Sequence, residues 1–218
     1  MAALAGVTWT TDADIVREGA VGCFRAVAAA ARDGAGERAI EALGGFRILC
    51  AHRRGPRGVT GWTARVESWL AQAGLAADGD WYAGRPLLVT ENDYGLGLYN
   101  GDTGVVIAAG GGRPAAVFER RSELVEFSPT RLGAVDTVYA MTVHKSQGSQ
   151  FDTAAVLLPD ASSPMLTREL LYTAVTRAKE HLILVGDEAA VRAAVARPVA
   201  RASGLARRLS PGRGFESD

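Results

Sequence analysis

The chain alternates between apolar residues at helical spacing and short runs that are apolar throughout. Helical spacing predicts helices near residues 11–32, 36–43, 59–70 and 167–178, and another from Asp187. Thr11 and Asp14 resemble a capping box for the first helix. Apolar runs predict buried strands at 46–51, 85–91, up to Val143, at 154–158 and at 181–186. Strands that alternate with helices indicate an α/β domain with a largely parallel sheet flanked by helices.

Between Asn92 and Val138 this pattern changes to short β-rich runs separated by turn residues. The runs are "GLGLYNGDTGVVI", with a turn at Asn100-Gly101, then "PAAVFE" and "ELVEF". We expect a small β-barrel inserted in the α/β domain. The predicted organisation is N-terminal helices (1–45), the α/β domain (46–91 and 139–200), the insertion (92–138) and a basic, flexible tail (201–218).

Composition narrows the class of protein. The 218 residues carry a formal net charge of zero, which argues against a generic nucleic-acid coat, although basic residues are in excess after Arg168. No apolar run approaches the roughly 18 residues of a membrane span, so we predict a cytoplasmic protein with no membrane partner. Cys23 and Cys50 lack a C-x-x-C pair or a His cluster, so we expect core thiols and no metal site.

The stretch "YAMTVHKSQGSQFD", residues 139–152, places a polar loop between two apolar segments. Its Thr, His, Ser and Gln side chains can donate hydrogen bonds, Lys145 adds a positive charge, and Gly148 permits close approach of the backbone. This combination suits phosphate or sugar oxygens. A polar loop that only caps its own strand end would have the same composition. Like "HRRGPRG" after the first strand, the loop is expected at the carboxyl ends of the sheet, where ligands of α/β domains bind.

Two arginines add weight to a phosphate site. Arg53 follows the first strand, and Arg177 ends the helix "RELLYTAVTRA", four residues after Thr173. A guanidinium stays charged and can fork onto phosphate oxygens, which suits stabilisation of charge during phosphoryl transfer. Each arginine alone is more typical of a surface ion pair. Together with the loop they form a candidate constellation.

Four stretches resemble, in this order, the C-terminal part of the alpha subunit of exodeoxyribonuclease V, the RecD family of superfamily 1 DNA helicases that move 5′ to 3′. The resemblance runs from about Leu43 to Leu209. It implies a second RecA-like domain and an SH3-like barrel for the insertion. The stretches are "RILCAHRRGPRGVTGWTARVE", "YAGRPLLVTENDYGLGLYNGDTGVV", "YAMTVHKSQGSQFD" and "RELLYTAVTRAKEHLILVGD".

The resemblance also implies roles for individual residues. Arg53 falls in helicase motif IV and Arg177 in motif VI, so both are expected to act on the ATP phosphates, with Arg54 an alternative to Arg53. In motif V, Gly148 and Gln150 are expected at the nucleotide. Gln150 stands where relatives often carry Glu, so a role that needs a carboxylate does not transfer. The residues of motif V expected to bind single-stranded DNA are Thr142, His144, Lys145, Ser146 and Gln147.

The sequence lacks the ATP-binding motifs that a complete helicase motor would contain. A P-loop ATPase needs G-x-x-x-x-G-K-[ST], and neither Lys145 nor Lys179 has that context. Asp187-Glu188 imitate a Walker B motif but follow motif VI, so Asp187 is expected to cap the next helix. We therefore expect ATP with Mg²⁺ to be bound mainly by a first motor domain that is missing here, and no ATP hydrolysis by this chain alone.

The expected partners are single-stranded DNA, a Walker-containing RecA-like domain in cis or in trans, and RecB- and RecC-like subunits. A helicase of conjugative transfer or a free-standing RecD-like enzyme shares the same motifs. The alternative from another class is a non-enzymatic single-stranded DNA-binding module with vestigial ATP arginines. Its supply of aromatic residues for base stacking is thin, since Tyr94, Tyr99 and Phe118 are as typical of a barrel core.

Overall fold

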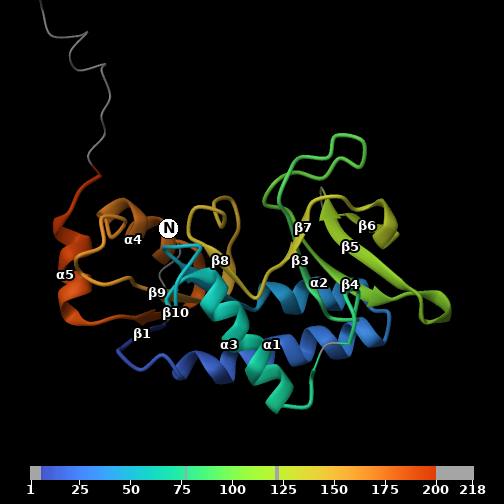
Figure 1. Cartoon of the computed structure of the whole chain (residues 1–218), viewed down its shortest axis with the longest axis horizontal. Helices are drawn as coiled ribbons and strands as arrows, with labels where there is room; N and C mark the ends of the chain where they lie inside the picture. Colours follow the sequence, from blue (N-terminus) through green and yellow to red (C-terminus); the bar gives the residue numbers. More distant parts are fainter. Residues whose placement is uncertain (1–5, 77, 121–122, 200–218) are drawn as a thin grey trace, which may run out of the picture.

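Two five-stranded β-sheets form the framework of the protein (Figure 1). The structure is a computed structural model that describes residues 6–76, 78–120 and 123–199, so the predicted basic tail at 201–218 lies outside the described residues. The first sheet is parallel, in the order β1-β10-β9-β2-β8. Its strands are β1 (Gly6–Thr10), β2 (Phe46–Cys50), β8 (Ala140–Thr142), β9 (Phe151–Leu157) and β10 (Ala178–Val185).

Helices cover both faces of this parallel sheet. Successive side chains of a strand point to opposite faces, so Ile48 and Cys50 enter one core and Leu49 enters the other. The first core contains residues of α1, α2 and α3, and the second contains residues of α4 and α5. The predicted α/β domain with a parallel sheet is therefore confirmed. The helices are α1 (Ile15–Arg32), α2 (Gly36–Gly44), α3 (Val59–Gln72), α4 (Arg168–Val175) and α5 (Glu188–Ala196).

The second sheet is antiparallel, in the order β6-β5-β4-β3-β7. One of its faces packs its own core around Phe118, and the other, through Val105 and Val117, joins the core of α1 and α2. A 3₁₀ turn at Gly110–Gly112 joins β4 to β5, and another at Pro129–Arg131 precedes β7. The strands are β3 (Pro86–Val89), β4 (Thr103–Ala108), β5 (Pro114–Arg120), β6 (Glu123–Phe127) and β7 (Val135–Thr137).

Two assignments from the sequence are corrected at this level. The strand predicted at 85–91 exists as β3, but it pairs with β4 and β7 rather than extending the parallel sheet. All four residues of β3 are buried, so its apolar run was no guide to which sheet it joins. The N-terminal segment contains β1, an edge strand of the parallel sheet, besides the predicted helices.

The start of α1 also differs from the predicted capping box. Asp14 is the N-cap residue, yet its side chain makes no capping hydrogen bond. Instead the backbone N–H of Asp14 donates to the Asp12 carboxylate at 2.8 Å, and that of Asp12 donates to the Thr10 hydroxyl at 2.9 Å. The polar residues thus shape the turn between β1 and α1. At α5 the prediction is confirmed, because Asp187 accepts a hydrogen bond from the N–H of Ala190 at 2.7 Å.

Both cysteines are free thiols. Cys50 is buried in β2, and Cys23 is partly buried with its thiol 3.2 Å from the carbonyl oxygen of Ala42. Burial raises the pKa of Cys23 from 9.0 to about 11 and that of Cys50 to about 12. Because the thiolate is the reactive form, burial disfavours the reaction of both thiols at neutral pH. Among the described residues, no helix has the length and apolarity of a membrane span.

Arg47 in β2 ties the parallel sheet to the segment that leaves the second sheet. Its side chain is 1% exposed. The guanidinium donates to the carbonyl oxygens of Val138, at 2.7 Å, and Leu43, at 3.3 Å, and lies 5.0 Å from the ring centroid of Phe151. Burial lowers the pKa of Arg47 to about 10, so the group stays charged at neutral pH.

We expect Arg47→Ala to lower the free energy of unfolding by about 2–4 kcal/mol, because two buried carbonyls lose their donor and a cavity forms. Arg47→Met should lose about half as much, since it refills most of the volume. Arg25→Ala, at an exposed position of α1, is the matched control and should change stability by less than about 0.5 kcal/mol. Urea unfolding gives all three values. An Arg47→Ala loss as small as that of the control would contradict this role.

Candidate functional site

The candidate site is built around the loop of residues 143–150, which connects β8 to β9. Both strands run parallel to β2, which lies between them. The loop must therefore leave the carboxyl end of β8 and return to the amino end of β9. On this path it passes β2, because β2 lies between β8 and β9. The expectation that the whole loop lies at the carboxyl ends is thus correct only for its first residues.

Two of the predicted DNA-binding side chains hold the loop in shape. Ser146 is completely buried, and its hydroxyl donates to the carbonyl oxygen of Val143 at 2.8 Å. Thr142 is 9% exposed, and its hydroxyl accepts the N–H of Lys145 at 3.3 Å. In this conformation Ser146 cannot reach a ligand, so its predicted DNA contact is corrected to a structural role. The local signal is that a hydroxyl three residues after a carbonyl can close a turn.

Other loop residues are accessible. His144, Gln147 and Gly148 are exposed, whereas Lys145 is half-buried. Gly148 has φ of 87°, in the left-handed region that glycine adopts without strain. These residues leave side chains and backbone of the loop open to a ligand.

The first residues of the loop, at the carboxyl end of β8, lie near Arg53. A cavity of about 470 Å³ is lined by His52, Arg53, Arg54, Thr142 and His144. His144 also lines a second cavity, of about 750 Å³, together with Gln147. Arg53 and Arg54 are both exposed, and neither forms an ion pair with the residues that the structure describes. The structure therefore brings Arg53 and Arg54 alike to the His144 end of the loop.

Arg177 lies at the other end of the loop. It follows α4 and precedes β10, at the amino end of the sheet. Its Nη1 donates to the carbonyl oxygens of Ser149, at 2.9 Å, and Ser146, at 3.4 Å, while Nε donates to Thr173 at 3.1 Å. Nη2 donates to the hydroxyl of Thr176 at 3.1 Å. Arg53 thus lines a cavity at the first end of the loop, whereas Arg177 contacts its other end and acts here as its clamp.

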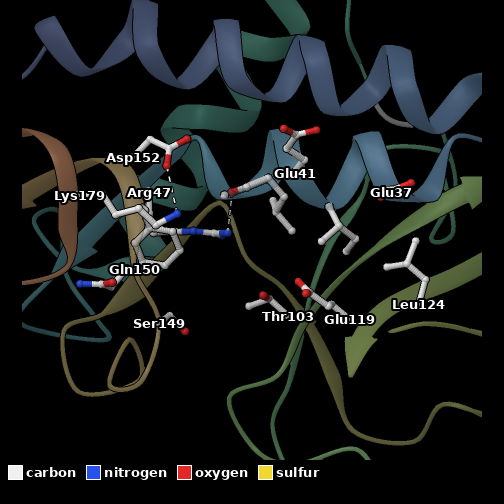
Figure 2. Close-up of a pocket in the computed structure, with 14 residues that line it drawn as sticks. Glu37, Glu41, Arg47, Thr103, Glu119, Leu124, Ser149, Gln150, Asp152 and Lys179 are labelled. Atoms are coloured by element: carbon white, nitrogen blue, oxygen red, sulfur yellow. Dashed lines mark hydrogen bonds and ion pairs between the residues drawn. The ribbon is translucent and has the colours of Figure 1, made fainter. Parts of the chain in front are cut away.

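Gln150 faces a different environment (Figure 2). Its amide donates to the carbonyl oxygen of Thr176 at 3.4 Å, and it lines a cavity of about 650 Å³ between α2 and the two sheets. Four carboxylates and two cations line that cavity, and the cation Lys179 is already paired with Asp152 at 3.2 Å. An excess of carboxylates repels phosphates, so this cavity does not suit a nucleotide. The carboxylates are Glu37, Glu41, Glu119 and Asp152, and the cations are Arg47 and Lys179.

Sequence reasoning missed the far wall of the cavity beside His144 and Gln147. This wall comes from the segment before α4 and the segment after α5, where Arg197 donates to the carbonyl oxygens of Ala161, at 3.2 Å, and Leu166, at 3.5 Å. Met165 and Thr167 complete it. These residues lie some distance apart along the chain, and no spacing in the sequence relates them to the loop.

The chain is similar to helicase proteins and to a helicase family model. The family model described as UvrD-like helicase C-terminal domain matches residues 137–185, which include the loop and α4. RecBCD enzyme subunit RecD of Mycobacterium tuberculosis is 56% identical over 81% of this chain and 31% of that protein. The ATP-dependent RecD2 DNA helicase of Deinococcus radiodurans is 33% identical over 71% of this chain and 22% of that protein.

A solved structure of Bacteroides Pif1 bound to ssDNA aligns with a TM-score of 0.39 and 17% identity, over 67% of this chain and 44% of that one. The chain spans about a third of the mycobacterial relative that it matches. The matched part of RecD is its C-terminal region. The chain is therefore similar, over most of its length, to the C-terminal part of RecD.

Proposed function

We propose that the chain is the C-terminal motor domain of a RecD-like ATP-dependent 5′–3′ DNA helicase that acts in DNA unwinding and recombinational repair. In this proposal the parallel sheet is the second RecA-like domain and the antiparallel sheet is its SH3-like insertion. One observation carries the proposal above all: a single loop, 143–150, connects the end of the sheet that bears Arg53 to the end that bears Arg177. Such a loop can couple a nucleotide to DNA.

The DNA contacts are assigned to the accessible part of the loop. His144 and Gln147 line an open cavity, and Lys145 supplies the positive charge near them. Phosphate contacts position single-stranded DNA, and their strength falls as salt rises. Ser146 then acts through the shape of the loop rather than by contact, while Thr142 both shapes the loop and lines the cavity beside Arg53.

The nucleotide contacts are assigned to the two arginines, with Gly148 offering backbone; because the arginines lie at opposite ends of the loop, one nucleotide reaches both only when the loop rearranges. Exposed Arg53 is available to a phosphate, and Arg177 would have to exchange a carbonyl partner for one. Gln150 is not assigned to the nucleotide, because the cavity that it lines carries an excess of carboxylates. The described residues bring no three His, Cys, Asp or Glu side chains together, so Mg²⁺ is assigned to a Walker-bearing RecA-like domain, in cis or in trans. RecB- and RecC-like subunits are the further partners that we propose.

The purified chain should bind single-stranded DNA but hydrolyse no ATP, with or without that DNA. The P-loop that binds the phosphates is not in its sequence, whereas the DNA-contacting loop is. Hydrolysis is measured by phosphate release, with Arg177→Ala as the control for a contaminating ATPase. DNA-stimulated release that disappears in this variant would contradict the assignment of the P-loop to another domain.

The second candidate is a non-enzymatic module that binds single-stranded DNA. It is favoured by the hydrogen bonds of Arg177, because every nitrogen of its guanidinium already donates to the protein itself. The two functions differ in one result. Only in a motor does Arg53 affect ATP hydrolysis once the chain is joined to a Walker domain.

A further inference from the structure

The loop of residues 92–101, which precedes β4, carries two tyrosines on the surface. Tyr94 is 79% exposed and Tyr99 is 51% exposed, with their ring centroids 6.3 Å apart and their planes at 77°. Phe118 is fully buried. Of the three aromatic residues considered for base stacking, one is therefore core and two are available.

The 92–101 loop is fixed by its own hydrogen bonds. The backbones of Asp93 and Leu98 pair in both directions, at 2.7 and 2.9 Å, and Leu98 is 1% exposed. The Asp93 carboxylate accepts the N–H of Leu96 at 2.9 Å, and Arg120 donates to the carbonyl oxygen of Leu96, also at 2.9 Å. A loop built in this way holds exposed rings in place before any ligand arrives, which lowers the entropy cost of binding.

Three acidic side chains lie within or beside this loop: Glu91 is exposed, and the carboxylates of the other two already accept hydrogen bonds. The Asp93 carboxylate accepts the N–H of Leu96, and the Asp102 carboxylate accepts the N–H of Tyr99 at 2.8 Å. Asn92 accepts the N–H of Asn100 at 2.8 Å. These bonds spread part of the negative charge onto backbone donors, which reduces its repulsion of a polyanion.

The loop also adjoins the proposed DNA-contacting loop. A Cβ atom placed on Gly101, directly after the tyrosine loop, would lie 4.0 Å from the carbonyl oxygen of Lys145. In Figure 1 the 92–101 segment is the green loop that rises beside β3 and β7, on the same side of the molecule as the gold loop above β8. A strand that follows residues 143–150 can therefore continue onto the tyrosines.

We propose that Tyr94 and Tyr99 form a stacking site for unpaired bases of the single-stranded DNA that contacts residues 143–150. The inference rests on the proposed DNA-binding function and adds a site to it. Aromatic rings stack on any base, so the site would bind without sequence preference. The edge-to-face pair leaves a face of Tyr94 open, as its high exposure indicates.

The test is fluorescence anisotropy of a labelled oligothymidylate titrated with the full chain. Tyr94→Ala and Tyr99→Ala should each weaken binding about tenfold, within the range for loss of one stacked base, while Tyr94→Phe and Tyr99→Phe should bind as the unaltered chain does. Tyr172→Ala is the matched control, because Tyr172 is 66% exposed on α4. Thermal melting confirms that each variant is folded.

An abasic strand of the same length shows whether weaker binding by the alanine variants comes from lost base stacking or from a changed structure of the 92–101 loop. The unaltered chain should bind it more weakly than oligothymidylate, and the alanine variants should show no further loss. Oligothymidylate binding that is unchanged in both alanine variants would overturn the stacking site while leaving the proposed function intact, and the tyrosines would then suit a protein partner. Equal losses on both strands would also overturn it. An unaltered chain that binds neither strand would overturn the site and the proposed DNA contact together.

Discussion

Arg177→Ala is expected to release the 143–150 loop from the end of α4 and to lower the free energy of unfolding by about 2–3 kcal/mol. The variant removes the donors to the carbonyl oxygens of Ser146, Ser149 and Thr173 at once. Ser146 is completely buried, so its carbonyl has little access to water. Three hydrogen bonds from a charged group could contribute more to the free energy of unfolding than this. Arg177 is only partly buried, however, so the expected loss stays below that larger value.

Trypsin offers a local measurement of the same release. Lys145 lies in the loop and is half-buried, so cleavage after it should be slow while the clamp is intact. In Arg177→Ala the loop opens more often, and we expect cleavage after Lys145 to become at least about tenfold faster, following the loss of local stability. Mass spectrometry of the early fragments identifies the site.

Two control variants keep this result specific. Arg177→Lys retains the charge, but its single ammonium nitrogen cannot reproduce the spread of Nε, Nη1 and Nη2 over the carbonyls, so it should lie between the unaltered chain and Arg177→Ala. Arg168→Ala removes a single bond, from an exposed arginine to the carbonyl oxygen of Val195 at 2.9 Å, and should change both measurements little. If Arg177→Ala changed neither stability nor cleavage more than Arg168→Ala, the clamp would be refuted.

The elements of the fold followed from the spacing of apolar residues. Burial on both faces explains why the runs at β2 and β9 could be recognised as strands of a parallel sheet. The same property gave no information on which strands pair with β3. An apolar run indicates that a strand is buried, but it does not indicate which strand lies beside it. β1 was missed since its burial alternates and its exposed positions are Val7 and Trp9. Closure of the second sheet into an SH3-like barrel stays a prediction.

The candidate site could be predicted as a set of residues but not as an arrangement. Local composition identified the loop, and Arg53 does lie beside His144. The sequence could not show that Ser146 turns inward or that Gln150 enters a carboxylate-lined cavity. Both outcomes depend on the path that the loop takes from the carboxyl end of β8 to the amino end of β9. That path is set by strand pairing between residues far apart in the chain.

The central claim is that this chain supplies arginines to ATP that another domain binds. Its most direct test uses a hybrid in which this chain replaces the matching C-terminal part of the mycobacterial RecD. That region is 56% identical, so the contacts with the rest of the protein should be largely kept. The hybrid should hydrolyse ATP when single-stranded DNA is present.

The decisive measurement is the DNA-stimulated ATP hydrolysis rate of this hybrid with Arg53→Ala, beside the same hybrid with Arg54→Ala. The account predicts a loss of about 10³-fold for Arg53→Ala, the lower end of what an arginine at the transferring phosphate contributes. Arg54→Ala should stay within about threefold of the unaltered hybrid, since the phosphate contact is assigned to Arg53 rather than to its alternative, Arg54. Equal rates for the unaltered hybrid and Arg53→Ala, or a hybrid that binds DNA without hydrolysing ATP, would contradict the claim and favour the non-enzymatic module.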